Sequence, residues 1–259
     1  MSAADRRKDA VGDRAEGQAS DEHARRVARM FGAIVRWYDP LNHILSGGLD
    51  RRWRACLADA VFPAVPGAAD RHCPPRILDL AAGTLDVALA LRRRHPDARI
   101  PAFDFCPPML AHGTGKLQGR DKAAVWPVAA DARALPLPDA CLDGITIAFG
   151  IRNIAPRSAA FAEMARVLVP GGRACVLEFG SEGGNLWYSL YRVYLKHILP
   201  LIGRLSGNAE AYRYLADTIL AFPGADALSE EMREAGFARV YHLAFCAGVV
   251  RLHVAEKAR

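Results

Sequence analysis

The chain has 259 residues, of which 51% are hydrophobic and 24% charged, and its formal net charge is +6. These values exclude a fibrous or wholly disordered protein and suit one α/β domain with a sizeable core. The modest positive balance fits an anionic cofactor, nucleic acid, an anionic lipid surface or simply a solvated basic surface.

The six cysteines have no C-x-x-C spacing, and no histidine is placed to complete a zinc site. We therefore expect reduced thiols and no metal. No apolar run reaches the roughly 18 residues of a spanning helix, and the N-terminus lacks the apolar core of a signal peptide. The protein is expected to be cytoplasmic, either soluble or peripheral at the inner face of the membrane.

Residues 1–23 mix Arg, Lys, Asp and Glu with Gly and Ser, which predicts a disordered N-terminal tail. The domain is then expected to span residues 24–259. It begins with a helical segment whose apolar residues recur at spacings of three and four: Val27, Met30, Phe31 and Ile34. Pro40 and the Gly47-Gly48 pair are expected to break this segment into short pieces.

Beyond residue 75, short apolar runs alternate with helical segments. Strands are predicted at residues 76–80, 99–105, 123–128, 143–150 and 173–180, followed by two more at 240–245 and 249–256. The alternation predicts a doubly wound parallel sheet, and the short link between the last two strands makes them antiparallel. The predicted fold is therefore α/β, with five parallel strands and a terminal antiparallel hairpin.

Ligands bind such sheets at the carboxyl ends of the strands. The first strand ends in the turn "DLAAGTLD", residues 79–86, where Gly83 would let the backbone approach a ligand closely. The alternative is an ordinary turn in which Thr84 or Asp86 caps the next helix.

Acidic residues follow the second and third strands. Asp104 could accept both hydroxyls of a ribose, or could cap the next helix. Asp131 could accept a hydrogen bond from an adenine amino group while Ala132 packs beside the ring, or could form an Asx-turn. These positions together indicate a nucleoside site more strongly than any one of them does.

The run "AFGIRN", residues 148–153, follows the fourth strand. A permanently charged residue directly behind a buried strand end is unusual, so Arg152 is a candidate for substrate binding and Asn153 for orienting a polar group. The alternative is an arginine that extends to the surface.

The sequence resembles the ubiquinone/menaquinone biosynthesis C-methyltransferase family from about Val27 to the last strand. The resemblance rests on "MFGAIVRWYDPLNHILSGGLDRRWR", "ILDLAAGTLD", "ALPLPDACLDGITIAFGIRNI", "RVLVPGGRACVLEF" and "AYRYLADTILAFPG". It implies a class I S-adenosylmethionine-dependent methyltransferase fold, with a seven-stranded, mostly parallel sheet and an antiparallel last strand. Cofactor contacts are then expected at Asp79, Gly83, Thr84, Asp104, Asp131, Ala132 and Ala148.

Two positions depart from the family pattern. Leu85 stands where glycine is common, and a leucine with a positive φ would be strained. Ala148 stands where the family often has serine, so that contact lacks a hydroxyl.

The resemblance implies attack by a ring carbon of a prenylated quinol on the sulfonium methyl. Asp86 is the candidate base, acting directly or through a water molecule, and Arg152 would stabilise the phenolate. Asn153 would orient a ring oxygen, and Tyr38 and Asp39 in the N-terminal segment would help to close the site. The residues expected to bind the substrate are Tyr38, Arg152, Asn153, Tyr191 and Tyr214.

A helical cap is expected at about residues 182–222. Its apolar positions could hold a prenyl chain, touch a membrane surface or simply pack into the core: Trp187, Leu190, Tyr191, Tyr194 and Ile198. A homodimer is an open alternative, and no nucleic-acid partner is expected.

Three other functions stay open. A nicotinamide dehydrogenase shares the fold class, although the chain has no G-x-G-x-x-G run. A methyltransferase acting on another lipid or small molecule is the second. A non-catalytic quinol-binding protein is the third, because Leu85 and Ala148 depart from the family.

Overall fold

The computed structural model describes residues 3–62, 73–180, 186–199 and 209–259. At its centre is a seven-stranded sheet in the order β3-β2-β1-β4-β5-β7-β6. The strands are β1 (Ile77–Leu80), β2 (Ile100–Asp104), β3 (Val125–Ala129), β4 (Leu142–Ala148), β5 (Leu168–Phe179), β6 (Phe237–Phe245) and β7 (Val250–Lys257). Strands β1 to β5 are parallel, and β7 is antiparallel to both β5 and β6. The predicted sheet, with its terminal antiparallel hairpin, is confirmed.

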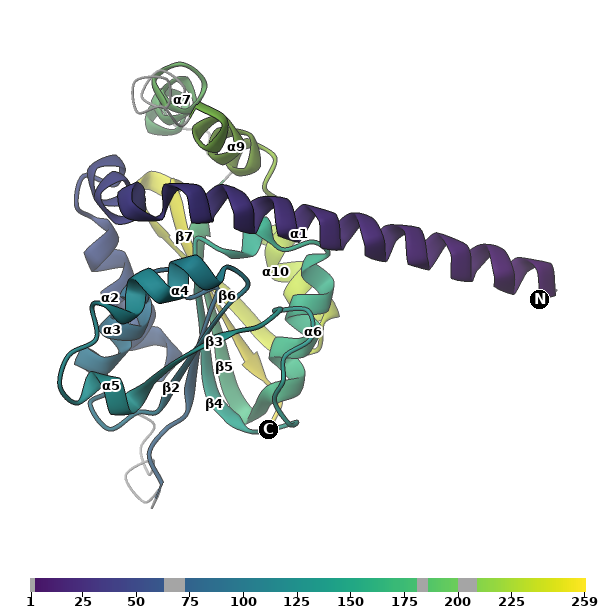
Figure 1. Ribbon diagram of the computed structural model, residues 1–259, viewed down its shortest axis with the longest axis horizontal. Coiled ribbons are helices and arrows are strands. Elements are labelled where there is room, and N and C mark those ends of the chain that lie inside the picture. Colours follow the sequence, from purple (N-terminus) through teal and green to yellow (C-terminus); the bar gives the residue numbers. More distant parts are fainter. Residues whose placement is uncertain (1–2, 63–72, 181–185, 200–208) are drawn as a thin grey trace.

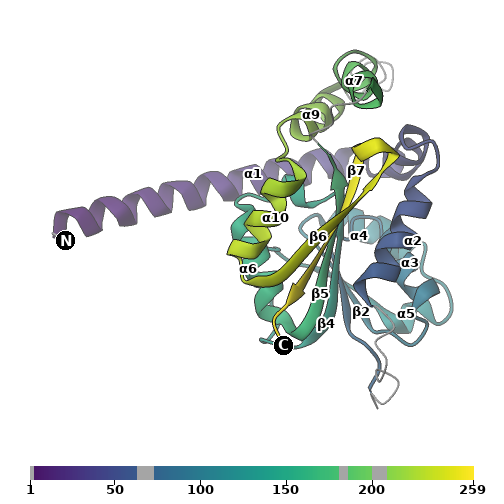
Figure 2. The ribbon, with the colours of Figure 1, turned by 180° about the vertical axis from the view of Figure 1, so that it is seen from behind.

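Helices cover both faces of the sheet (Figures 1 and 2). The longer ones are α1 (Ala3–Leu45), α2 (Asp50–Val61), α3 (Asp86–Arg94), α4 (Pro107–Thr114), α6 (Arg157–Val167), α7 (Leu186–Val193), α9 (Ala209–Leu220) and α10 (Ala225–Glu234). The shorter ones are α5 (Asp121–Ala124), η2 (Ile151–Asn153), η3 (Tyr194–Ile198) and η4 (Cys246–Gly248).

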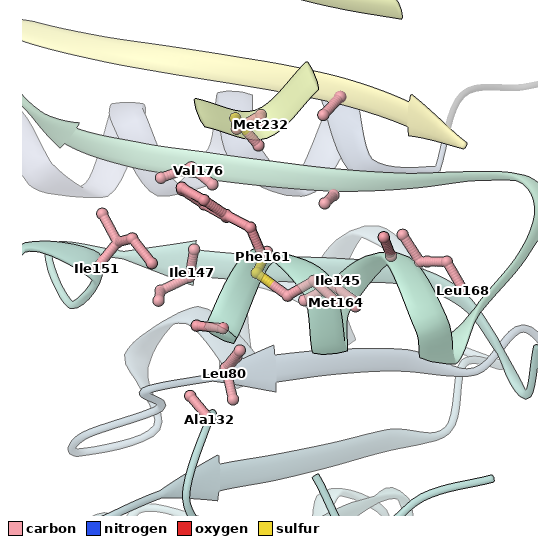
Figure 3. Close-up of a cluster of buried hydrophobic side chains, with 14 of the residues drawn as sticks. Leu80, Ala132, Ile145, Ile147, Ile151, Phe161, Met164, Leu168, Val176 and Met232 are labelled. Atoms are coloured by element: carbon pink, nitrogen blue, oxygen red, sulfur yellow. The ribbon is translucent and has the colours of Figure 1, made fainter. Parts of the chain in front are cut away.

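The central strands are apolar on both sides because each face of the sheet carries its own layer of helices. On one face, Phe161 and Met164 of α6 pack over Ile145 and Ile147 of β4, with Met232 of α10 nearby (Figure 3). On the other face, a second buried cluster joins α2 and α3 to the sheet. The two clusters hold the parallel strands rigidly, so that their carboxyl ends form a fixed edge.

Helix α1 differs from the sequence expectation. Residues 3–23 are helical where a disordered tail was expected, and this part of α1 projects away from the sheet (Figure 1). The segment has few apolar residues to bury, which is why disorder was expected. It is nevertheless rich in Ala, Arg, Glu and Lys, whose high helix propensity does not depend on burial. The helix also continues through Pro40 to Leu45, so only the glycine pair ends it.

Helices α7 and α9 form a layer beyond α1 (Figures 1 and 2). The η3 segment that follows α7 packs against α9 through a small cluster of buried side chains: Leu195, Leu199, Tyr212, Ala216 and Ile219. This layer lies within the predicted cap at residues 182–222, of which 182–185 and 200–208 lie outside the described residues. None of the helices in the described ranges is both long enough and apolar enough to span a bilayer.

Candidate active site

The turn after β1 is held against the end of β2 by a carboxylate. Gly83 has a φ of +52°, and its backbone N–H donates to Asp104 Oδ2 over 2.8 Å. The backbone N–H of Cys106 donates to Asp104 Oδ1 over 2.7 Å. Burial raises the pKa of Asp104, and these two hydrogen bonds oppose the shift. Each oxygen of Asp104 keeps a lone pair for a ligand hydroxyl.

Leu85 has the positive φ that its sequence position suggested, at +66°. Its side chain is fully buried and lies against Gly113 of α4. A Cβ at Gly113 would be 2.6 Å from Leu85 Cγ and 2.7 Å from the carbonyl carbon of Thr84. Packing into the space left by this glycine offsets the backbone strain at Leu85.

A cavity lies over the carboxyl ends of β1 to β4, with an empty volume of about 810 Å³. We name it the cofactor cavity. Helix α1 forms one wall of it, along more of its length than the site closure expected of Asp39 requires. The α1 residues in this wall are Ala24, Val27, Ala28, Phe31 and Tyr38. Five residues expected to contact the cofactor also line it: Gly83, Asp104, Asp131, Ala132 and Ala148.

The two other expected cofactor residues lie elsewhere. Asp79 is buried in the sheet, where Thr146 Oγ1 donates to its Oδ1 over 3.2 Å. Burial raises the pKa of Asp79 to about 8, although this hydrogen bond opposes the shift. Thr84 lines a second cavity and donates to Asp39 of α1. Asp79 therefore supports the turn from beneath, and Thr84 ties the turn to α1.

Asp131 is held by Arg133, whose Nη2 lies 2.7 Å from Asp131 Oδ2. Arg133 also pairs with Asp21 of α1 over 2.6 Å. Burial alone would raise the pKa of Asp131, but the bonds from Arg133 outweigh it and the pKa is lowered. The carboxylate lines the cofactor cavity, and both of its oxygens accept hydrogen bonds from Arg133.

The second cavity lies between the sheet edge and the layer of α7 and α9, with an empty volume of about 1170 Å³. We name it the substrate cavity. It shares part of its wall with the cofactor cavity. The shared residues are Tyr38, Ala81, Gly83, Ala148 and Phe149. Two ligands bound in these cavities would meet at this shared wall.

Asp86, the candidate base, lines the substrate cavity within a charged network. Arg54 Nη1 lies 2.8 Å from its Oδ2, and Lys116 Nζ lies 2.7 Å from its Oδ1. Lys116 also pairs with Asp39, and Arg54 with Asp50. Both oxygens of Asp86 are thus engaged in ion pairs. Asp86 fits a structural role at the cavity wall better than that of a direct base.

Arg152 lines the substrate cavity, where it is paired with a residue that sequence analysis missed. Its Nη1 lies 2.6 Å from Glu178 Oε1, and the two side chains are 4% and 1% exposed. Nη1 also donates to the carbonyl of Phe149 over 2.7 Å, and the guanidinium lies 5.5 Å from the ring centroid of Phe179. Burial raises the pKa of Glu178, while the charge of Arg152 opposes the shift.

This ion pair leaves hydrogen-bonding capacity unused. In the described part of the chain, Arg152 Nε and Glu178 Oε2 are buried without a hydrogen-bond partner. The hydroxyl of Tyr191, which lines the same cavity, is also buried without one. Buried polar groups in this state need an explanation, and a polar ligand in the cavity would supply partners.

Asn153 and Tyr214 are brought together, but not in the substrate cavity. The hydroxyl of Tyr214 donates to Asn153 Oδ1 over 3.1 Å, and Asn153 lines the cofactor cavity. The structure therefore does not support the expected substrate contacts of these two residues. Of the remaining expected substrate residues, Tyr38, Arg152 and Tyr191 do line the substrate cavity.

The cofactor cavity fits S-adenosylmethionine. Asp104 offers acceptors for ribose hydroxyls, Asp131 an acceptor for the adenine amino group, and Ala132 an apolar surface for the ring. The positive φ of Gly83 keeps the backbone open beside them. Within the described ranges, no group of three or more His, Cys, Asp or Glu could hold a metal ion.

Comparisons with known proteins agree with this geometry. The model of the ubiE/COQ5 methyltransferase family matches residues 18–257. The chain is 44% identical to a demethylmenaquinone methyltransferase of Thermus thermophilus, over 88% of this chain and all of that protein. It is 38% identical to the ubiquinone/menaquinone biosynthesis C-methyltransferase UbiE of Geobacter sulfurreducens, over 91% of this chain and 90% of that one.

Among solved structures, a SAM-dependent methyltransferase of Thermotoga maritima has the same fold. The TM-score is 0.59 at 16% identity, over 88% of this chain and 98% of that one.

Proposed function

The chain belongs to the ubiE/COQ5 methyltransferase family and is an S-adenosylmethionine-dependent methyltransferase, and from this premise we propose that it methylates a ring carbon of a prenylated quinol. The substrate is demethylmenaquinol, the corresponding benzoquinol of the ubiquinone pathway, or both. One observation carries the proposal: the cofactor and substrate cavities share a wall at Gly83, Ala148 and Phe149.

Alignment of the two reactants is the main contribution of the protein. When bound, S-adenosylmethionine supplies a methyl group that is already activated as a sulfonium. Asp104 and Asp131 fix the nucleoside, and the shared wall directs the ring carbon toward the methyl group. Such positioning can contribute up to roughly 7–11 kcal/mol in favourable cases.

Arg152 is proposed to bind the ring oxygen. A quinol ring carbon becomes a better nucleophile as the neighbouring hydroxyl loses its proton, and a buried guanidinium stabilises the resulting phenolate. The Tyr191 hydroxyl, which lines the same cavity, supplies a second polar contact. Because Arg54 and Lys116 occupy both oxygens of Asp86, we propose that Asp86 takes part in the reaction through a water molecule and not by direct contact with the ring.

A membrane surface is proposed as the source of the substrate. Three apolar side chains of α7 and η3 are exposed: Leu190 (52%), Val193 (53%) and Ile198 (48%). Arg192 and Lys196 are exposed beside them. Apolar residues flanked by cations suit contact with the surface of an anionic bilayer.

Labelled methyl donor tests the proposal. The protein is incubated with S-adenosylmethionine carrying a labelled methyl group and with the demethylated naphthoquinol and benzoquinol in turn, each under reducing conditions. We expect label in a ring carbon of at least one product, located by mass spectrometry and NMR. Label in neither quinol, in a protein that binds the cofactor, would contradict the proposed substrate class.

A further inference from the structure

A third cavity opens between α7 and the turn that joins the last two strands. We name it the outer cavity. Its outer residues are Leu49, Leu190, Cys246, Ala247 and Val249. The described residues that line it include no charged side chain. An apolar ligand therefore suits this cavity better than a polar one.

The outer cavity continues the substrate cavity. Five residues line both: Ser46, Trp53, Phe179, Tyr191 and Tyr194. Phe179 and Tyr191 are stacked, with ring centroids 6.4 Å apart, and the guanidinium of Arg152 lies over the Phe179 ring. The polar groups thus lie at the inner end, and the wall becomes apolar toward the outside.

The far wall is a rigid turn. Cys246, Ala247 and Gly248 all have positive φ, at 50°, 57° and 95°. The N–H of Gly180 donates to the carbonyl of Val249 over 2.9 Å, and a Cβ at Gly180 would lie 2.3 Å from the carbonyl oxygen of Gly248. The turn is therefore pressed against the end of β5, whose last residue lines both cavities.

We infer that the outer cavity holds the isoprenoid tail of the substrate, with the C-terminal turn at Cys246–Val249 as its outer wall. The inference rests on the proposed function, because a tail is needed to fill the cavity. Among the described residues, Tyr191 and Phe179 connect a ring bound at Arg152 to this apolar cavity. The route ends beside Leu190, on the side proposed to face the membrane.

A bulky residue in the turn tests the route. The probes are two demethylated naphthoquinols, one with a tail of several isoprene units and one without a tail. In Ala247→Phe, the ratio of kcat/KM for the tailed over the tailless quinol should fall at least about tenfold, the smallest effect usual for a lost pocket contact. Ala244→Phe, at an exposed position of β6 outside the cavity, is the matched control and should keep the wild-type ratio.

A thiol reaction tests the same site without turnover. Cys246 lines the outer cavity and Cys56 of α2 is exposed outside it, so alkylation of both is followed by mass spectrometry. Geranylgeraniol, which carries a tail but no ring, should slow alkylation of Cys246 and not of Cys56. If the ratio in Ala247→Phe equals that of the wild type, or if both thiols react unchanged, the tail site is wrong. If no quinol is methylated but Cys246 is protected, the proposed function fails and the tail site stands.

Discussion

Replacing Arg152 by methionine should lower both the free energy of unfolding and the turnover of the enzyme. The ion pair with Glu178 is almost fully buried, at 4% and 1% exposure, with 2.6 Å between the charged atoms. Removing one partner of such a pair leaves an uncompensated charge and typically costs about 3–5 kcal/mol. For a domain of this size, where 1 kcal/mol shifts Tm by about 2–4 °C, the loss corresponds to roughly 6–20 °C.

The double variant Arg152→Met/Glu178→Met separates the two roles. Two apolar side chains of similar volume leave no buried charge, so most of the lost free energy of unfolding should return. Turnover should stay about 10²–10³-fold below wild type in both variants, as is usual when one charged donor to an oxyanion is lost.

Urea unfolding measures the free energy of unfolding, and transfer of a labelled methyl group measures turnover. A loss below about 1 kcal/mol in the single variant would refute the structural argument, since such a value is typical of an exposed pair. Wild-type turnover in the double variant would refute the catalytic one.

Three further predictions follow from the cofactor turn. Asp104→Ala should weaken S-adenosylmethionine binding by about 1–3 kcal/mol, because two backbone donors of the cofactor turn lose their acceptor. Calorimetry measures the affinity, and an unchanged Kd would exclude a role for Asp104 in cofactor binding. Leu85→Gly should keep cofactor affinity but lower the Tm. Losing a buried leucine costs about 2–5 kcal/mol, judged from Leu→Ala substitutions, which exceeds the roughly 1–3 kcal/mol of backbone strain that glycine relieves. A raised Tm would contradict this prediction. Asp79→Asn should gain stability relative to wild type as pH rises from about 4 to 8. The pKa of Asp79 is raised on folding, so the unfolded chain loses its proton first and the wild type weakens across that window; parallel Tm curves would contradict the shift.

The order of strands and the acidic strand ends could be predicted from the sequence. Apolar runs of strand length alternate with helices, and chirality leaves few topologies for such a chain. Asp104 and Asp131 follow directly from this, because the carboxyl ends of parallel strands meet at one edge. The wall formed by α1 could not be predicted, since amphipathic spacing shows that a helix has an apolar face but not what the face covers.

Glu178 was missed although the sequence carries a signal for it. It is the only charged residue in the apolar run from Ala174 to Phe179, and an acid in a buried strand needs a partner. The roles expected of Asp86 and Asn153 depended on distances that spacing does not contain. Asp86 is engaged by Arg54 and Lys116, which lie 32 and 30 residues away in the chain.

The contact at Gly113, where no side chain intervenes, joins the cofactor turn to helix α4. With no side chain as a spacer, α4 rests directly on the backbone of Thr84, and the Cys106 thiol just before α4 donates to the carbonyl of Ala28 in α1. The cofactor turn, α4 and α1 are therefore held in direct contact, and a shift of α4 would move the turn that carries Gly83. Substitutions on the outer side of α4 will change cofactor affinity without touching the cofactor, and a screen restricted to cavity residues will overlook them.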